Sequence, residues 1–420
     1  MGRVRRRMAE VRPLHALTYN LAAVSLDDVT APPYDVIDPA LRRELVRRSP
    51  FNVVEIDLPE APGDVDPYEY AGETLEEWTL QGILTSERRP SMWALEQDYT
   101  GPDGRRRTRR GIICRIRVTE YGPGRVRPHE RTHPGPKEDR LRLTRATRHN
   151  LSPIFALHPG DAWSEIVPAV AGDPWGQATD ADGTVHRVWR VADPAAHEGV
   201  AIALADAELL IADGHHRYET ALTYANEVGG EGEHRYTLAS LTSLEDPGLT
   251  TFGYHRIVAD VDGDRRDRLD LAIGEHFDVE EFPLDRLDPA GESGIGVFGY
   301  FDAGGGRGLR LRLRDQRAAD EALTGRSEAY RRLDAAILEE LLLRGALGMS
   351  DEDLEAKRGI SYAASADAAI AAAEGGGAAF LLRPAPIEQV REVAAAGEAM
   401  PPKSTYFFPK LLTGLVFNPL

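Results

Sequence analysis

Apolar positions along the first 120 residues follow helical and strand periods in turn. An apolar residue at every third or fourth position indicates a helix with one buried face, and a short apolar run indicates a buried strand. The predicted helices cover 39–48 and 68–81, and the predicted strands cover 52–58, 91–99 and 109–118. The sequence Gly-Pro-Asp-Gly at 101–104 joins the last two strands, so the pattern predicts a hairpin.

The middle of the chain contains a loop, a charged helix and a strand that runs directly into a glycine turn. Proline and glycine interrupt residues 122–140, which predicts a loop, and a helix is predicted from about 138 to 149. Strands are predicted over 154–157, 185–191 and 208–212. The last strand is followed by Asp-Gly-His-His-Arg at 213–217 and then by an amphipathic helix, an order that favours ligand binding at the turn.

Beyond residue 250 the pattern predicts a second sheet followed by helices. The predicted strands cover 252–258, 294–301 and 308–314, and the predicted helices cover 328–347, 363–374 and 387–396. The glycine-rich run at 304–308 lacks the Gly-Lys-Ser/Thr ending of a phosphate loop and predicts a hairpin turn. These elements predict an α+β protein with mixed sheets and three regions, at 1–125, 126–258 and 259–420.

Composition restricts the class of protein. The 420 residues suffice for two or three domains, and no run approaches the ~18 apolar residues of a membrane span. The net charge of 50 − 68 = −18 argues against nucleic acid as a partner, because binding the phosphate backbone needs a basic face. One cysteine, Cys114 in an apolar run, excludes a disulfide framework and predicts a buried, inert thiol. No apolar signal-peptide core follows the basic N-terminus, so we expect a cytoplasmic protein.

Lysine is rare in this chain and gathers in a few segments. It occurs only at 137, 357, 403 and 410, which leaves 50 − 4 = 46 arginines. A lysine binds an anion as a compact point charge, whereas arginine presents a planar fork. Three of the four lysines fall in segments with candidate chemistry, although chance placement is the alternative for each one.

The loop sequence His129-Glu130-Arg131-Thr132-His133 spells a zinc-protease signature. That signature needs a helix, and prolines directly before and after this segment disfavour one. Without the helix, the loop places Glu130 among the cations Arg131, Lys137 and Arg140, which predicts a general base beside a phosphate-bearing substrate. A solvated charged loop is the alternative.

The Asp-Gly-His-His-Arg turn predicts a phosphate site. The first turn of a helix presents unpaired N–H groups, and Gly214 allows the backbone to approach a phosphate closely. His215, His216 and Arg217 add donors for phosphate oxygens, and Asp213 either caps the helix or binds Mg²⁺ that phosphates also bind. An ordinary capped turn is the alternative.

Two further segments are candidates for binding substrate. The C-terminal segment offers two ammonium groups and two hydroxyls, from Lys403, Ser404, Thr405 and Lys410. Near the other end of the sequence, the rigid loop at Pro32-Pro33 offers the side chains of Tyr34 and Asp35. For the C-terminal segment, a strand that packs its aromatic residues into a core is the alternative.

Five segments together resemble one protein family. They are APPYDVI at 31–37, HERT at 129–132, NLSPIF at 150–155, ADGHHRYETA at 212–221 and MPPKSTYFFPK at 400–410. In sequence and order they resemble the bacterial and archaeal family catalogued as domain of unknown function 1015. The resemblance spans nearly the whole chain.

The Asp-Gly-His-His-Arg turn is also similar to the phosphate-binding turn of the ParB/sulfiredoxin group, which includes kinases of free L-serine. This local resemblance implies a ParB/sulfiredoxin-like nucleotide-binding core, with a further α+β region towards the C-terminus. It implies that nucleotide phosphates rest on residues 214–217, with Mg²⁺ bridging them. Glu130 would take the proton of the serine hydroxyl, and Lys403 and Lys410 would neutralise phosphate.

The leading hypothesis is a small-molecule kinase that uses ATP or ADP and Mg²⁺ to convert L-serine to O-phospho-L-serine. Its catalytic residues would be Glu130, His216 and Asp213. A metal-dependent phosphate-ester hydrolase, using His129 and His215 in addition, is a second hypothesis. A ParB-like nucleotide-binding regulatory protein is a third. The sequence leaves the oligomeric state open.

Overall fold

The structure is a computed structural model that describes residues 9–130, 132 and 134–420. These residues form two compact units. The first unit contains the described residues up to Pro128, together with Thr132–Leu249 and Pro409–Leu420. The second contains residues 129 and 130 and Thr250–Phe408. Residues 9–125 and most of the described residues of 126–258 thus belong to one unit.

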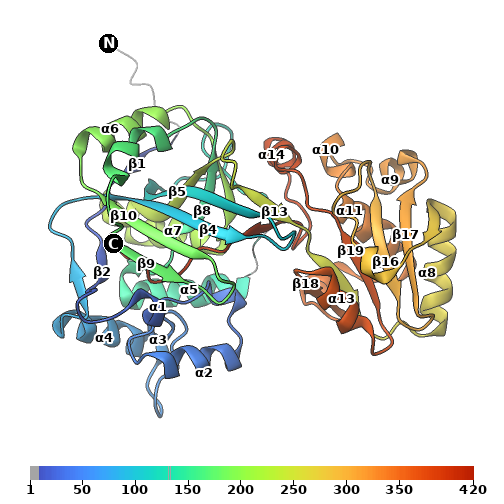
Figure 1. Ribbon diagram of the computed structural model, residues 1–420, viewed down its shortest axis with the longest axis horizontal. Coiled ribbons are helices and arrows are strands. Elements are labelled where there is room, and N and C mark those ends of the chain that lie inside the picture. Colours follow the sequence, from blue (N-terminus) through green and yellow to red (C-terminus); the bar gives the residue numbers. More distant parts are fainter. Residues whose placement is uncertain (1–8, 131, 133) are drawn as a thin grey trace. The chain divides into compact units, whose positions relative to one another are not determined.

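The first unit is built on a nine-stranded mixed sheet (Figure 1). Its strand order is β6-β11-β8-β12-β5-β4-β10-β9, with β1 also pairing with β5. The pairs β12–β8 and β11–β6 are parallel and the others are antiparallel. The strands are β1 Val11–Arg12, β4 Met92–Thr100, β5 Arg106–Arg117, β6 Val126–Arg127, β8 Ile154–His158, β9 Gly176–Thr179, β10 Val185–Val191, β11 Leu209–Asp213 and β12 Tyr236–Ser243.

Helices and two small strand pairs complete this unit. Helix α5 packs against both α4 and α7. The helices are α1 Leu26–Val29, α2 Pro39–Arg48, α3 Val54–Asp57, α4 Pro67–Leu80, α5 Pro134–Thr147, α6 Pro194–Ala203 and α7 His215–Val228, with short 3₁₀ turns at Tyr34–Val36, Trp163–Glu165, Val167–Val170 and Glu233–Arg235. The small pairs are β2 Leu17–Tyr19 with β3 Leu84–Ser86, and β7 His149–Asn150 with β21 Asn418–Pro419.

Several local predictions are confirmed in this unit, and two are wrong. The β4–β5 hairpin and helices α2 and α4 form where the sequence predicts them. The predicted strand over 52–58 is instead the short helix α3. The amide side chain of Asn52 explains this difference, because its oxygen accepts from Val54 N while its nitrogen donates to the carbonyls of Asp28 and Thr30. These bonds turn the chain where a strand would continue.

The loop predicted up to residue 140 ends earlier than expected, because helix α5 begins at Pro134 and ends at Thr147. Proline is compatible with the first position of a helix, where its missing N–H would have no partner in any case. The sequence prediction treated Pro134 only as a helix breaker and therefore placed the start of this helix too late.

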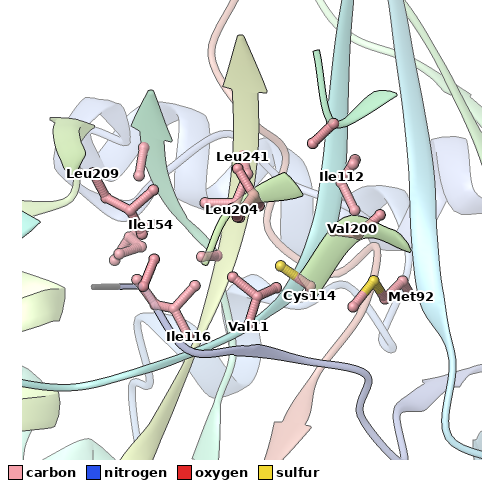
Figure 2. Close-up of a cluster of buried hydrophobic side chains, with 14 of the residues drawn as sticks. Val11, Met92, Ile112, Cys114, Ile116, Ile154, Val200, Leu204, Leu209 and Leu241 are labelled. Carbon is pink, nitrogen blue, oxygen red and sulfur yellow. The ribbon is translucent and has the colours of Figure 1, made fainter. Parts of the chain in front are cut away.

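The core of the first unit contains the single cysteine (Figure 2). Cys114 on β5 lies among Met92, Ile112 and Val200 and is fully buried. Burial raises the pKa of its thiol well above the usual range, because the thiolate would lose its hydration. The prediction of a buried thiol is confirmed.

We therefore expect Cys114 to be inert towards thiol reagents in the folded protein. Native protein should show less than about a tenth of one thiol per chain over an hour with 5,5′-dithiobis(2-nitrobenzoate), and one thiol in guanidinium chloride, because only the exposed thiolate reacts. Fast labelling of the native protein would contradict the packing in Figure 2.

The second unit is built on a six-stranded antiparallel sheet. Its order is β15-β17-β16-β19-β14-β18, and the separate strands β13 and β20 pair with each other. The strands are β13 Thr250–Phe252, β14 His255–Val258, β15 Phe277–Glu281, β16 Val297–Asp302, β17 Arg307–Leu313, β18 Ile360–Ala363, β19 Ala378–Leu382 and β20 Tyr406–Phe408. The helices are α8 Gly263–His276, α9 Gln316–Ala322, α10 Glu328–Arg331, α11 Asp334–Leu338, α12 Asp351–Glu355, α13 Ala366–Ala373 and α14 Ile387–Ala395, with a π-helix at Glu339–Ala346 and a 3₁₀ turn at Leu284–Arg286.

The predicted glycine hairpin is confirmed between β16 and β17, where Asp302 pairs with Arg307. The single helix predicted over 328–347 is wrong in detail, because α10, α11 and the π-helix divide it. The α+β class predicted from the sequence holds in both units. Among the residues that the structure describes, no helix is long and apolar enough to span a membrane.

The second unit contains a buried histidine that makes its stability depend on pH. His255 is 3% exposed, and its Nδ1 accepts a hydrogen bond from Leu382 N at 3.1 Å. Burial lowers the pKa of this imidazole to about 4, from about 6.5 in the unfolded chain. Between these two values the unfolded state binds more protons, so the free energy of unfolding falls as the pH falls from about 6.5 towards 4.

We expect the variant His255→Asn, whose amide oxygen can accept the same hydrogen bond, to lose less stability than the wild type between pH 7 and 4.5. The difference should be about 2 kcal/mol, measured by urea unfolding. Circular dichroism is the suitable signal, because all five tryptophans lie in the first unit. His276→Asn, a change at the end of α8, is the control and should behave as the wild type. Equal losses in the wild type and His255→Asn would contradict this assignment.

Candidate functional site

The turn between β11 and α7 is the centre of the candidate site. Strand β11 is buried up to Ala212, and Gly214 then takes the left-handed conformation with φ of 90° as it begins α7. The carbonyl of Gly214 accepts from Tyr218 N at 3.0 Å, and Gly214, the residue before the first turn, has no side chain with which to cap the helix. Helix α7 is 14 residues long. The N–H groups in the first turn of a helix point along its axis beyond its N-terminus, and donors of this kind bind phosphate.

Two cations flank the carboxylate of Asp213 at this turn. Its Oδ2 atom lies 3.6 Å from a guanidinium nitrogen of Arg217 and 3.6 Å from Lys410 Nζ. All three side chains are mostly buried. The same guanidinium of Arg217 donates to Ser152 Oγ at 3.1 Å and to the carbonyl of Pro153. The turn therefore gathers one carboxylate and two positive charges beside a helix N-terminus.

A buried polar network holds the backbone of Lys410. Gln97 Nε2 donates to the carbonyl of Lys410 at 3.1 Å, and Arg109 donates to the carbonyl of Pro409 at 2.6 Å. Arg109 also binds Gln97 Oε1 through two nitrogens, at 3.0 and 2.6 Å. Burial lowers the pKa of Arg109 to about 10, which leaves it protonated at neutral pH. The sequence analysis missed Arg109 and Gln97, because nothing in the strand pattern marks them.

This network continues away from Lys410 to a buried histidine. His186 lies 3.2 Å from Gln97 Nε2 and 2.9 Å from Asp180 Oδ2. Burial lowers the pKa of His186, although Asp180 opposes this shift. The neutral imidazole and Asp180 thus fix the orientation of the Gln97 amide, which in turn fixes the segment that carries Lys410.

The two predicted histidines occupy the first turn of α7. His215 is buried and His216 is half-buried, at the first two positions of the helix. They share this turn with the predicted Gly214 and Arg217, as the sequence spacing requires.

A second cluster of charges lies around Arg140 of α5. Arg140 binds Asp57 Oδ1 at 2.9 Å and Asp139 Oδ2 at 2.7 Å, and it stacks over the Tyr34 ring at 4.3 Å. Burial raises the pKa of Asp57, while Arg140 and Arg217 oppose the shift. Burial also raises the pKa of Tyr34 to about 12. Asp35, which the sequence also predicts to bind substrate, directly follows Tyr34 in the chain, and its side chain is exposed.

A small cavity of about 40 Å³ lies beside this cluster and reaches Arg217 of α7. Asp57, Arg140, Ser152 and Arg217 all line it. The predicted phosphate ligand Arg140 is bound to two carboxylates, and both Arg140 and Arg217 act electrostatically on Asp57. The sequence analysis missed Asp57, although an acid in the apolar run Val53–Leu58 was a signal that could have found it.

Lys137 contacts α7 one turn beyond the predicted phosphate ligands. Its Nζ lies 2.9 Å from Glu219 Oε2, which also accepts from Thr132 Oγ1 at 2.6 Å. Arg131, another predicted phosphate ligand, lies outside the described residues.

The other predicted site residues belong to the second unit. His129 is almost fully buried, with Nε2 2.8 Å from Thr405 Oγ1, and its carbonyl accepts from Met400 N at 2.7 Å. Glu130 forms a parallel bridge with Met400, so this segment is extended, as expected for a loop rather than a zinc-binding helix. Electrostatic interaction connects Glu130 to Arg256, whose side chain is buried.

The C-terminal motif is divided between the two units. Ser404 Oγ donates to the carbonyl of Pro401 at 2.6 Å, and Lys403 Nζ lies 5.0 Å from the centre of the Tyr254 ring, all within the second unit. Lys403 has a positive φ of 56°. Lys410 instead belongs to the first unit, beside Asp213. The predicted aromatic strand is confirmed as β20.

The chemistry of these side chains fits Mg²⁺ but not a metal held by protein alone. In the described part of the chain, no group of three or more His, Cys, Asp or Glu residues could hold a metal ion. The hydrolase hypothesis required such a group. Mg²⁺ commonly takes one carboxylate together with phosphate oxygens and water, and the Asp213 carboxylate at the β11–α7 turn would fit that role.

Several solved structures are similar to this chain, all with low TM-scores and low sequence identity. A free serine kinase mutant in complex with ADP has a TM-score of 0.35 and 14% identity, over 67% of this chain and 83% of that chain. A conserved hypothetical protein from Pyrococcus furiosus has a TM-score of 0.34 and 15% identity, over 67% and 86%. SbnI from Staphylococcus aureus, truncated at its C-terminus, has a TM-score of 0.35 and 10% identity, over 69% and 82%.

No curated protein matches this chain. The family model described as protein of unknown function (DUF1015) matches residues 11–336, which include the Pro-Pro loop, the HERT segment and the Asp-Gly-His-His-Arg turn. The match confirms the family expected from the five sequence motifs. The chain therefore belongs to the DUF1015 family.

Proposed function

We propose that this protein is a nucleotide-dependent phosphotransferase that converts free L-serine to O-phospho-L-serine. The observation that carries the proposal is the β11–α7 turn, where Lys410 and Arg217 both lie 3.6 Å from Asp213 at the start of a helix. Transfer of a phosphoryl group requires mainly positioning and neutralisation of phosphate charge. A helix N-terminus with two adjacent cations meets that requirement.

In this proposal the nucleotide phosphates rest on the first N–H groups of α7. Gly214 has no side chain to obstruct them, and its positive φ orients the following peptides towards the phosphate. Lys410 binds as a point charge, and Arg217 adds N–H donors in a planar fork. The Gln97–Arg109 network holds Lys410 in place before the nucleotide arrives, which lowers the entropy cost of binding.

Asp213 would hold Mg²⁺ together with the phosphates, and bound Mg²⁺ would supply positive charge that stabilises the transferred group. Without the ion, Asp213 is balanced by Arg217 and Lys410. The proposal assigns His216, at the second position of α7, to donate a hydrogen bond to the transferred phosphoryl group.

Glu130 is assigned as the base, and this assignment rests on the sequence. The serine hydroxyl oxygen forms a bond to the terminal phosphorus, the bond from that phosphorus to the nucleotide oxygen breaks, and the hydroxyl proton passes to the Glu130 carboxylate. The remaining predicted substrate-binding residues would orient serine: Tyr34, Asp35, Lys403, Ser404 and Thr405.

A thermal-shift series tests the nucleotide part of the proposal. ATP or ADP with Mg²⁺ at 100 times its dissociation constant should stabilise the fold by about 2.7 kcal/mol, because the ligand binds only the folded state. For a unit of this size that corresponds to a rise in Tm of about 5–10 °C. We expect no comparable rise with adenosine, which lacks phosphates. Equal shifts with adenosine and ADP would contradict phosphate recognition at the turn.

A further inference from the structure

The second unit contains a cavity that is separate from the phosphate turn of the first. Its volume is about 480 Å³, within the range of small-molecule sites. The inner wall is formed by buried side chains, namely Arg256, Leu333, Leu382, Met400 and Ser404. Two exposed acids of α14, Glu388 and Glu392, line it as well. Arg256 therefore lies among apolar side chains, whereas the two acids of α14 are exposed to solvent.

Arg256 is the most buried of the charged side chains that line this cavity. The side chain is 2% exposed, and its two terminal nitrogens donate to the carbonyls of Tyr254 at 2.7 Å and Pro402 at 3.3 Å. These bonds engage two of five N–H donors. Arg256 also lies over the Tyr362 ring at 5.6 Å, and among the described residues the carboxylates of Glu339 and Glu130 act on it electrostatically but form no ion pair with it. By contrast, buried Arg310 has Glu292 at 2.9 Å.

A buried guanidinium without a carboxylate is costly, because its hydration is lost and not replaced by an opposite charge. Burial accordingly lowers the pKa of Arg256, and the more distant Tyr362, Glu339 and Glu130 only oppose this shift. A ligand carboxylate would supply the missing partner and two strong, charge-assisted hydrogen bonds.

The other charges at depth are already paired with one another. Arg383 binds Asp334 Oδ2 at 2.8 and 2.7 Å, and Glu292 binds Arg310 and Arg312. These pairs leave Arg256 as the cation available to a carboxylate.

The two acids of α14 are negative charges without a cationic partner among the described residues. Glu388 and Glu392 are four residues apart and therefore lie on the same face of the helix. Within the part of the chain that the structure describes, neither forms an ion pair. They provide negative charge where a ligand would face solvent.

We propose that this cavity binds a small zwitterion of the amino-acid class. Its carboxylate pairs with Arg256, its ammonium group faces Glu388 and Glu392, and its carbon chain contacts Leu333, Leu382 and Met400. The inference does not depend on phosphoryl transfer, since every residue of the site lies in the second unit.

Calorimetric titration of the full-length protein with each of the twenty amino acids tests this proposal. For any amino acid that binds, the matched carboxylic acid without the amino group and the matched amine without the carboxylate are titrated too. We expect at least one amino acid to bind with Kd below about 1 mM, and each truncated analogue to bind at least about tenfold more weakly.

Variants locate the binding. Arg256→Lys removes the planar fork and should weaken binding at least about tenfold. Because Arg256 is buried and its replacement can affect folding, the double variant Glu388→Gln/Glu392→Gln provides an independent test on exposed positions. It should reduce the preference for the amino acid over its analogue without the amino group, and Glu374→Gln, directly after α13, should change nothing.

Two results would overturn the proposal: no binding by any amino acid at 10 mM, or binding that both Arg256→Lys and the double glutamine variant leave unchanged. Gly214→Val separates this proposal from the proposed function. It should abolish nucleotide binding but leave amino-acid binding intact, so either proposal can fail alone.

Discussion

Replacement of Gly214 by valine is expected to lower the affinity for ATP or ADP by at least about 100-fold while the protein remains folded. Gly214 has φ of 90°, a conformation that a β-branched residue adopts only with strain. A Cβ atom here would also lie 2.9–3.0 Å from the Arg217 guanidinium. Valine would therefore displace both the first N–H groups of α7 and one of the two cations. A loss of about 2.8 kcal/mol corresponds to 100-fold in affinity.

The opposite end of the same helix offers a matched control. Gly229 ends α7 with φ of 71°, and a Cβ atom there would meet nothing within 4 Å. Gly229→Val thus introduces backbone strain of about 1–3 kcal/mol without touching the proposed phosphate site. Both variants should show a similar fall in Tm, but only Gly214→Val should lose nucleotide binding. Unchanged nucleotide affinity in folded Gly214→Val would show that the turn does not bind phosphate.

Replacement of Glu130 by glutamine should lower kcat for serine phosphorylation by about 10²–10⁴-fold. Glutamine has nearly the same shape but cannot take the hydroxyl proton, and this is the usual contribution of a positioned general base. Nucleotide affinity should remain within about twofold of the wild type, because the proposal places the phosphates on α7 and not on Glu130.

The control for this variant is again Glu374→Gln, which removes an exposed carboxylate of the same unit. It should leave kcat unchanged. Because Glu130 interacts electrostatically with buried Arg256, Tm should be measured for both variants. A Glu130→Gln protein with wild-type Tm and wild-type kcat would exclude Glu130 as the base.

The local geometry of the β11–α7 turn could be predicted from the sequence. An apolar run, a glycine and an amphipathic helix follow one another within 209–228, so their spacing alone specifies strand, turn and helix. The β4–β5 hairpin was predictable for the same reason, because its turn sequence lies between two strand patterns.

Contacts between distant segments could not be predicted in this way. Lys410 lies 197 residues after Asp213 in sequence, and only the fold brings their side chains to 3.6 Å. The ion pair between Arg140 and Asp57 could not be predicted for a related reason. The apolar pattern assigns the segment of Asp57 to a strand, whereas the hydrogen bonds of the Asn52 side chain favour the short helix α3 there. Local patterns contain no information about either contact.

The most direct test of the proposed function is to incubate the purified protein with L-serine, Mg²⁺ and either ATP or ADP, and to measure O-phospho-L-serine by ³¹P nuclear magnetic resonance. The account predicts a phosphomonoester signal that requires both serine and nucleotide, that disappears in Gly214→Val and that persists in Gly229→Val. Absence of O-phospho-L-serine with either nucleotide, in protein that is folded by circular dichroism, would contradict it.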